Sequence, residues 1–95
     1  MVRVYKRREF SIYAQNDSYI VHNTKKEFHE GHTHINNFNT AKYLIKMSLG
    51  KHIPYHASNY LIESLIRLSN DARYTESLKR IQNKHPYKKQ KKEIS

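Results

Sequence analysis

The sequence contains no cysteine and no tryptophan, and only two glycines and two prolines among 95 residues. The lack of cysteine excludes disulfides, thiol catalysis and zinc sites that need thiolate ligands. Two glycines are too few for a glycine-rich phosphate loop or a flexible interdomain linker. No run of about 18 apolar residues is present, so no membrane span is expected. The charged residues 1–10 lack the apolar stretch of a secretory signal, and we expect a cytoplasmic protein.

Positive charge, by contrast, is abundant. The chain contains 18 Lys and Arg residues and eight Asp and Glu residues, which gives a net charge of +10. Residues 1–10 hold four basic residues and one acidic residue, and residues 71–95 hold eight and three, whereas the middle of the chain is nearly neutral. Cations gathered at the ends of a chain are typical of segments that contact a polyanion.

The length and the apolar content indicate one small domain. Leu, Ile, Val and Phe number 21, just above the fraction of about one fifth below which a highly charged chain is expected to stay unfolded. We therefore expect a single folded domain over residues 1–85, followed by a basic, disordered tail over residues 86–95.

Residues 10–22 predict a β-hairpin. Apolar and polar side chains alternate in residues 10–14, residues 15–18 have turn chemistry, and residues 19–22 are rich in β-branched and aromatic side chains. Residues 2–5 are expected to add a third, basic strand. Because a two-stranded ribbon is marginal by itself, helices should cover its apolar face.

The C-terminal two thirds of the chain predict helices. The first follows an N-cap at Asn39-Thr40 and ends at Gly50, which is expected in the left-handed conformation. Pro54 suits the first turn of the second helix, whose apolar side chains continue to residue 68. A third helix is predicted over residues 72–83. The fold class is thus α+β, with a short N-terminal antiparallel sheet of two or three strands packed against two or three helices.

The leading interpretation is a non-enzymatic protein that binds RNA or DNA, mainly through phosphates. Tyr5 and Tyr13 fall on predicted strands beside cations, where nucleic-acid bases commonly stack, although tyrosines paired across strands would also explain them. The N-terminal cationic patch is expected to comprise Arg3, Lys6, Arg7 and Arg8. The C-terminal patch is expected to comprise Arg73, Lys79, Arg80, Lys84, Lys88, Lys89, Lys91 and Lys92.

A histidine-rich segment, residues 29–34, is an alternative site. Its imidazoles, His29, His32 and His34, suit zinc or another divalent cation. If residues 32–34 are extended, His32 and His34 lie on one face about 7 Å apart. The tetrapeptide at 31–34 resembles one at the metal centres of metallophosphoesterases, but the further motifs of those longer enzymes are lacking. We favour helix capping or phosphate contact over metal-dependent hydrolysis, and expect no cofactor.

A second alternative is an adaptor that binds an acidic protein. The apolar helix faces and the same Lys and Arg residues would serve such a partner. A defined protein complex that survives nuclease treatment would distinguish this alternative from nucleic-acid binding.

Overall fold

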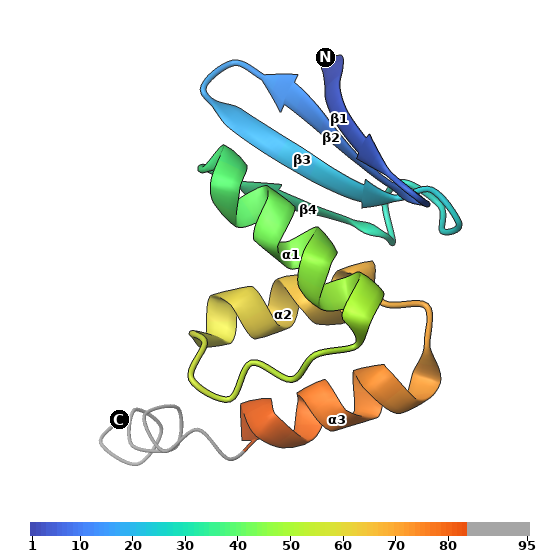
Figure 1. Cartoon of the computed structure of the whole chain (residues 1–95), viewed down its shortest axis with the longest axis vertical. Helices are drawn as coiled ribbons and strands as arrows, with labels where there is room; N and C mark the ends of the chain where they lie inside the picture. Colours follow the sequence, from blue (N-terminus) through green and yellow to red (C-terminus); the bar gives the residue numbers. More distant parts are fainter. Residues whose placement is uncertain (84–95) are drawn as a thin grey trace.

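Figure 1 shows the computed structural model, which describes residues 1–83. Four strands are followed by three helices, in the order β1 (Val2–Arg7), β2 (Phe10–Gln15), β3 (Ser18–Asn23), β4 (His32–Ile35), α1 (Phe38–Gly50), α2 (Asn59–Leu68) and α3 (Ala72–Asn83). The strands are antiparallel and lie in the sheet in chain order. The predicted α+β class is confirmed, with four strands rather than two or three. The tail predicted over residues 86–95 lies outside the described residues.

The additional strand is β4, whose sequence reads as a polar loop. It pairs with β3 from His32, opposite His22, to Ile35, opposite Tyr19. Ile35 is buried, and the buried Thr33 hydroxyl shares a hydrogen bond of 2.8 Å with Ser64 of α2. Because β4 turns one threonine and one isoleucine inward, it has no apolar run from which a strand could be predicted.

The core lies between one face of the sheet and the helices (Figure 1). We call this the covered face. Its buried side chains include Phe10, Ile12, Val21 and Ile35, and the helices contribute Ala41, Leu44, Ile45, Ile62, Leu65, Leu68, Tyr74 and Leu78. Helices α1 and α2 pack on the sheet, and α3 packs on α2. None of the helices within residues 1–83 is long and apolar enough to cross a membrane.

Helix α1 begins and ends differently from the prediction. Its N-cap is Asn37, whose side chain accepts a hydrogen bond from the backbone N–H of Thr40. At the other end Gly50 is still helical, and Lys51 adopts the left-handed conformation with a φ of 55°. The ring of His52 lies close to Gly50 and would have to shift to make room for a side chain there. A Cβ on Gly50 would lie 2.4 Å from Nε2 of His52.

Helix α2 begins five residues later than predicted. Pro54 is buried in the connection before the helix, where its carbonyl oxygen accepts from the N–H of Ala57 in a turn. The helix begins at Asn59, after Ser58, whose hydroxyl accepts from the N–H of Leu61. A capping side chain, and not the proline, therefore decides where α2 starts.

Helix α3 begins at Ala72, as predicted, continues to the last described residue, Asn83, and is anchored to the end of α1. The ring of Tyr74, a residue of α3, is buried. The hydroxyl of Tyr74 donates to the carbonyl oxygens of His52 at 2.7 Å and Met47 at 3.3 Å. Burial, and secondarily the neighbouring Tyr43, raises the pKa of Tyr74 to about 12. The backbone at the end of α1 is therefore fixed by α3.

Candidate nucleic-acid interface

The face of the sheet opposite the core carries two rows of side chains, each of which crosses all four strands. Strand pairing defines the rows as Lys6, Ser11, His22 and His32, and Arg3, Tyr13, Ile20 and His34. Each row begins with a cation on β1 and ends with an imidazole on β4. We call these eight residues the open face.

A β-bulge in β1 brings both cations to the open face. Arg3 and Lys6 are three positions apart, and in a regular strand such side chains point to opposite sides. The register shifts between Arg3 and Tyr5, so that Arg3 pairs with Tyr13 and Lys6 with Ser11. One extra residue in the edge strand therefore aligns the two cations, and the bulge also discourages pairing with another sheet.

Rings cover the β3 and β4 side of the open face. Phe28, from the β3–β4 loop, stacks on His32 with ring centroids 4.4 Å apart and planes within 8° of parallel. His22 meets Phe28 edge-on at 5.1 Å, and His34 meets His32 edge-on at the same distance. Ile20, in the middle of its row, is only 3% exposed. A ligand on this surface would therefore meet rings rather than aliphatic side chains.

Hydrogen bonds fix the orientation of two of these rings. Nε2 of His22 donates to the carbonyl oxygen of Lys26 at 3.0 Å, and Nδ1 of His32 donates to that of Phe28 at 2.6 Å. A carbonyl oxygen only accepts, so in each ring the bonded nitrogen carries the hydrogen. Rings held in place before binding lower the entropy cost of holding a ligand.

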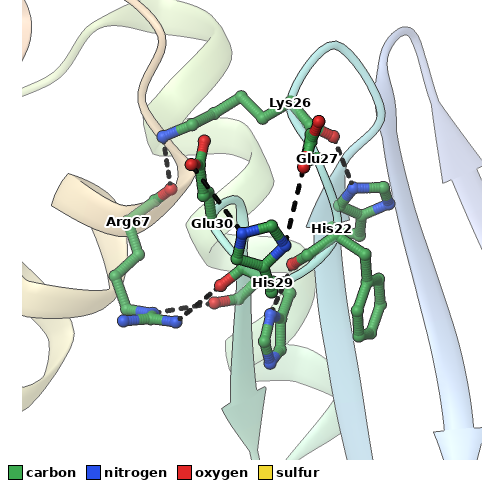
Figure 2. A network of polar contacts seen from close by, with 8 residues as sticks. His22, Lys26, Glu27, His29, Glu30 and Arg67 are labelled. Atoms are coloured by element: carbon green, nitrogen blue, oxygen red, sulfur yellow. Dashed lines mark hydrogen bonds and ion pairs between the residues drawn. The ribbon is translucent and has the colours of Figure 1, made fainter.

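The β3–β4 loop that carries Phe28 is tied to the last turn of α2 (Figure 2). Nζ of Lys26 donates to the carbonyl oxygens of Arg67 and Ser69, both at 2.9 Å. The buried side chain of Asn23 donates to the carbonyl oxygen of Leu68 at 2.8 Å. Carbonyls at a helix end lack partners within the helix, and the loop supplies them. The loop and α2 thus form one structural unit.

Side chains of α2 cover the outer edge of β4. Nε of Arg67 donates to the carbonyl oxygen of His32 at 2.9 Å, and its Nη2 reaches that of His29 at 3.4 Å (Figure 2). The hydroxyl of Tyr60 donates to the carbonyl oxygen of His34. These bonds occupy carbonyls that another strand would need. A ligand therefore meets the face of the sheet at β4 rather than its edge.

The four predicted N-terminal cations are divided between two surfaces. Arg3 and Lys6 belong to the open face. Arg7 and Arg8 instead line a hollow at the end of α1, together with Lys46. The sequence predicts one patch, but alternation along β1 turns Lys6 and Arg7 to opposite sides of the sheet, and Arg8 lies in the turn that follows.

The two predicted base-stacking tyrosines face opposite sides of the sheet. Tyr13 lies on the open face and is half-buried. Tyr5 pairs with Ile12 on the covered face, where its ring meets that of Phe38 edge-on at 6.0 Å and Lys42 Nζ lies 5.5 Å from the ring centroid. Tyr5 is therefore a packing residue, and Tyr13 is the tyrosine available to a ligand.

The cations of α3 lie at the other end of the molecule from the sheet. Arg73, Lys79 and Arg80 are exposed on α3, which packs on α2 (Figure 1). The other predicted members of this patch, Lys84, Lys88, Lys89, Lys91 and Lys92, lie outside the described residues. Within residues 1–83, the two predicted patches do not converge on one surface.

The three histidines considered as metal ligands have different surroundings. The exposed ring of His29 faces Glu27 and Glu30, with nitrogen-to-oxygen distances of 3.7 and 3.8 Å (Figure 2). His32 and His34 instead belong to the ring layer of the open face. In the described part of the chain, no group of three His, Asp or Glu side chains is placed to hold a metal ion.

Comparisons with protein-family models, with curated proteins and with solved structures give no match to this chain. Function must therefore be inferred from the chemistry of the surfaces, because a fold class by itself does not specify an activity.

Three residues important to these surfaces were not predicted as site residues. Phe28 is an isolated aromatic residue in a polar loop, and this isolation is the signal that could have identified it. Lys46 and His52 have no comparable local signal. They become part of a surface only because the distant Arg7 and Arg8 fold against the same helix end.

Proposed function

We propose that this protein binds single-stranded nucleic acid on the open face of its sheet. The two rows that run from a cation on β1 to an imidazole on β4 carry the proposal. Phosphates suit the Lys and Arg side of such a surface, and unstacked bases suit its rings. The rows span three strand spacings, about 14 Å, which provides room for bases beside a backbone.

The charge of the open face supports a polyanionic ligand. Neither row contains an acidic residue. Glu9 and Asp17 lie in the turns at the two ends of β2, and Glu27 and Glu30 both face His29 in the β3–β4 loop. Arg3 and Lys6 are therefore the charged groups that a ligand meets at the β1 side, and each neutralised phosphate would release counterions.

The rings distinguish this proposal from the adaptor alternative. An acidic protein would use the same cations but would gain little from the stacked Phe28 and His32. The rings also favour single strands over duplexes, because bases in a duplex are already stacked on one another.

Fluorescence anisotropy with the full-length chain tests the proposal. We expect labelled single strands of about ten nucleotides to bind more tightly than a duplex of the same length. Affinity should fall steeply between about 50 and 200 mM salt. Absence of single-strand binding at the lower salt, or tighter binding of the duplex, would contradict the proposal.

Variants of the open face locate the interface. Tyr13→Ala and His34→Ala should each weaken single-strand binding by about 1–3 kcal/mol, because each removes a stacking surface. Arg3→Gln and Lys6→Gln should each reduce the slope of log affinity against log salt by about 0.7. Lys79→Gln is the matched control, since it removes an exposed cation from α3. An equal effect of Lys79→Gln would place the interface on α3 and refute the proposal.

A further inference from the structure

Two adjoining hollows lie at the end of α1 and share Lys46 and His52 as walls. The smaller hollow, of about 450 Å³, is also lined by Arg7 and Arg8. The larger hollow, of about 670 Å³, is also lined by Tyr43, Tyr55 and His56. Both volumes are in the range of small-molecule sites in proteins. We call the pair the double hollow.

The smaller hollow is cationic. It is lined by Arg7 at the end of β1, by Arg8 in the β1–β2 turn and by Lys46 of α1. No described residue that lines either hollow is acidic. Cations without carboxylate partners match the charge of a phosphate, and guanidinium groups also match its geometry.

The end of α1 carries a partial negative charge that would oppose an anion. Two of its last carbonyl oxygens are already occupied, because that of Met47 accepts from the N–H of His52 and that of Ser48 from the N–H of Lys51. The hydroxyl of Tyr74 also donates to the carbonyl oxygen of Met47. These bonds offset part of the helix-end charge next to the cations.

The larger hollow is aromatic. The side chains of Tyr43 and Tyr55 line it although they are 42% and 66% exposed, and Pro54 and Leu61 add apolar surface. Exposed rings beside a concave apolar surface suit a flat, partly polar ring such as a nucleobase.

The backbone of His52, the residue shared by both hollows, is held by hydrogen bonds at its N–H and its carbonyl oxygen. Its backbone N–H donates to Met47, and its carbonyl oxygen accepts from the hydroxyl of Tyr74 at 2.7 Å. Its imidazole lies against Gly50, where a Cβ would come within 2.4 Å. A larger residue at position 50 would therefore displace the ring.

Arg8 reaches the smaller hollow from the β1–β2 turn. Its φ of 54° lies in the left-handed region, as does that of Asn16 in the β2–β3 turn, and the geometry of a two-residue hairpin turn accounts for both. Glycine adopts this conformation with less strain than arginine, so the turn tolerates Arg8→Gly.

We infer that the double hollow binds a nucleoside phosphate, with the phosphate against Arg7, Arg8 and Lys46 and the base against Tyr43 and Tyr55. The ligand is a free nucleotide or the phosphorylated end of a strand, since both have the same chemistry. The double hollow is separate from the open face. The inference therefore goes beyond the proposed function and does not depend on it.

Chemical-shift titration of the full-length chain tests this inference, with inorganic phosphate, adenosine, AMP and a trinucleotide with or without a 5′-phosphate as probes. AMP should shift the amides of residues 43–52 and should bind at least about tenfold more tightly than phosphate or adenosine, because it joins both halves of the ligand. Tighter binding of AMP than of the phosphorylated trinucleotide identifies a free nucleotide, and the reverse order identifies a strand end.

Either of two results would overturn the inference. One is that AMP leaves these amides unmoved, and the other is that phosphate or adenosine alone binds as tightly as AMP. If AMP leaves these amides unmoved while a trinucleotide shifts the amides of Tyr13, His32 and His34, the inference fails and the proposed function is supported. The two failures are therefore distinguishable.

Two substitutions separate binding from folding. Arg8→Gly relieves the left-handed strain and removes a guanidinium, so the affinity for AMP should fall about tenfold without a lower melting temperature. Gly50→Ala introduces a good helix former but displaces the ring of His52, and should also lower the affinity for AMP. Lys42→Gln, one turn earlier in α1, is the control that should leave affinity unchanged. Unchanged AMP affinity in Arg8→Gly would refute the inference.

Discussion

The two faces of the sheet use alternate residues of the same four strands for different purposes. The covered face buries aliphatic side chains such as Ile12, Val21 and Ile35 against the helices. The open face presents rings and cations, among them Tyr13, His34 and the cations of β1. The difference shows that one face carries the stability of the sheet, which leaves the chemistry of the other face free for contact with a ligand.

The largest expected effect comes from adjacent residues of β2 that lie on opposite faces. Ile12→Ala should lower the free energy of unfolding by about 2–5 kcal/mol, because it leaves a cavity in the core. Tyr13→Ala should lower it by less than about 1 kcal/mol, the size of a cross-strand pair. Urea unfolding of both variants measures the contrast, and equal losses would break the comparison between the faces.

The next effect concerns Asn23, at the end of β3, where the sheet meets α2. Asn23→Ala should cost about 1–3 kcal/mol, because it leaves the buried carbonyl oxygen of Leu68 without its hydrogen bond. Lys26→Met keeps the aliphatic part of the side chain and removes only the more exposed bonds to α2, so it should cost less. Thermal unfolding measures both, and the reverse order would assign the anchoring of α2 to Lys26.

A third variant tests a buried residue on the open face. Ser11 is 0% exposed, and within residues 1–83 its hydroxyl has no hydrogen-bond partner. Ser11→Ala should therefore leave stability unchanged or raise it by about 1 kcal/mol, since it removes an unsatisfied polar group. Truncation of a buried residue would then lower stability on the covered face, as in Ile12→Ala, but not on the open face, as in Ser11→Ala. A clear loss of stability in urea would show that Ser11 contributes to the packing of this face.

The smallest effect is expected far from both faces, at the N-cap of α3. The backbone N–H of Tyr74 donates to Asp71 and lowers the pKa of its carboxyl group below the ordinary value of 3.8, although desolvation opposes this. A lowered pKa means that the stabilisation is present above the unfolded pKa and is lost as the pH falls through the folded one. The stability advantage over Asp71→Asn should therefore shrink below about pH 4, as acid titration followed by circular dichroism would show.

The sequence predicts those helices and strands whose side-chain patterns and turn residues lie within the element itself. The β2–β3 hairpin follows from alternation around a turn, and α3 begins at Ala72, where the sequence predicts its start. The strand β4 was not predictable in this way, because its pairing with β3 rather than its composition makes it a strand. The sequence predicts a left-handed helix end at Gly50, whereas Lys51 adopts that conformation, and the approach of the His52 ring to Gly50 cannot be read from the sequence.

The candidate site was predictable in residue type but not in arrangement. Arg3, Lys6 and Tyr13 were predicted as ligand contacts, and they do share one face of the sheet. Regular alternation would have placed Tyr5 beside Arg3. The bulge between them turns Tyr5 towards the core and brings Lys6 to the open face, and no local pattern announces such an extra residue.

The bonds from the β3–β4 loop to α2 have a consequence for the order of folding. Asn23 and Leu68 are 45 positions apart, so the last carbonyls of α2 gain these partners only after the strands have closed. Distant contacts of this kind form late and slowly. We therefore expect the amides of α2 and of β3 to exchange with solvent hydrogen in the same opening event. The open face is then the outer surface of a cooperative unit, and it loses its shape only when the whole unit opens.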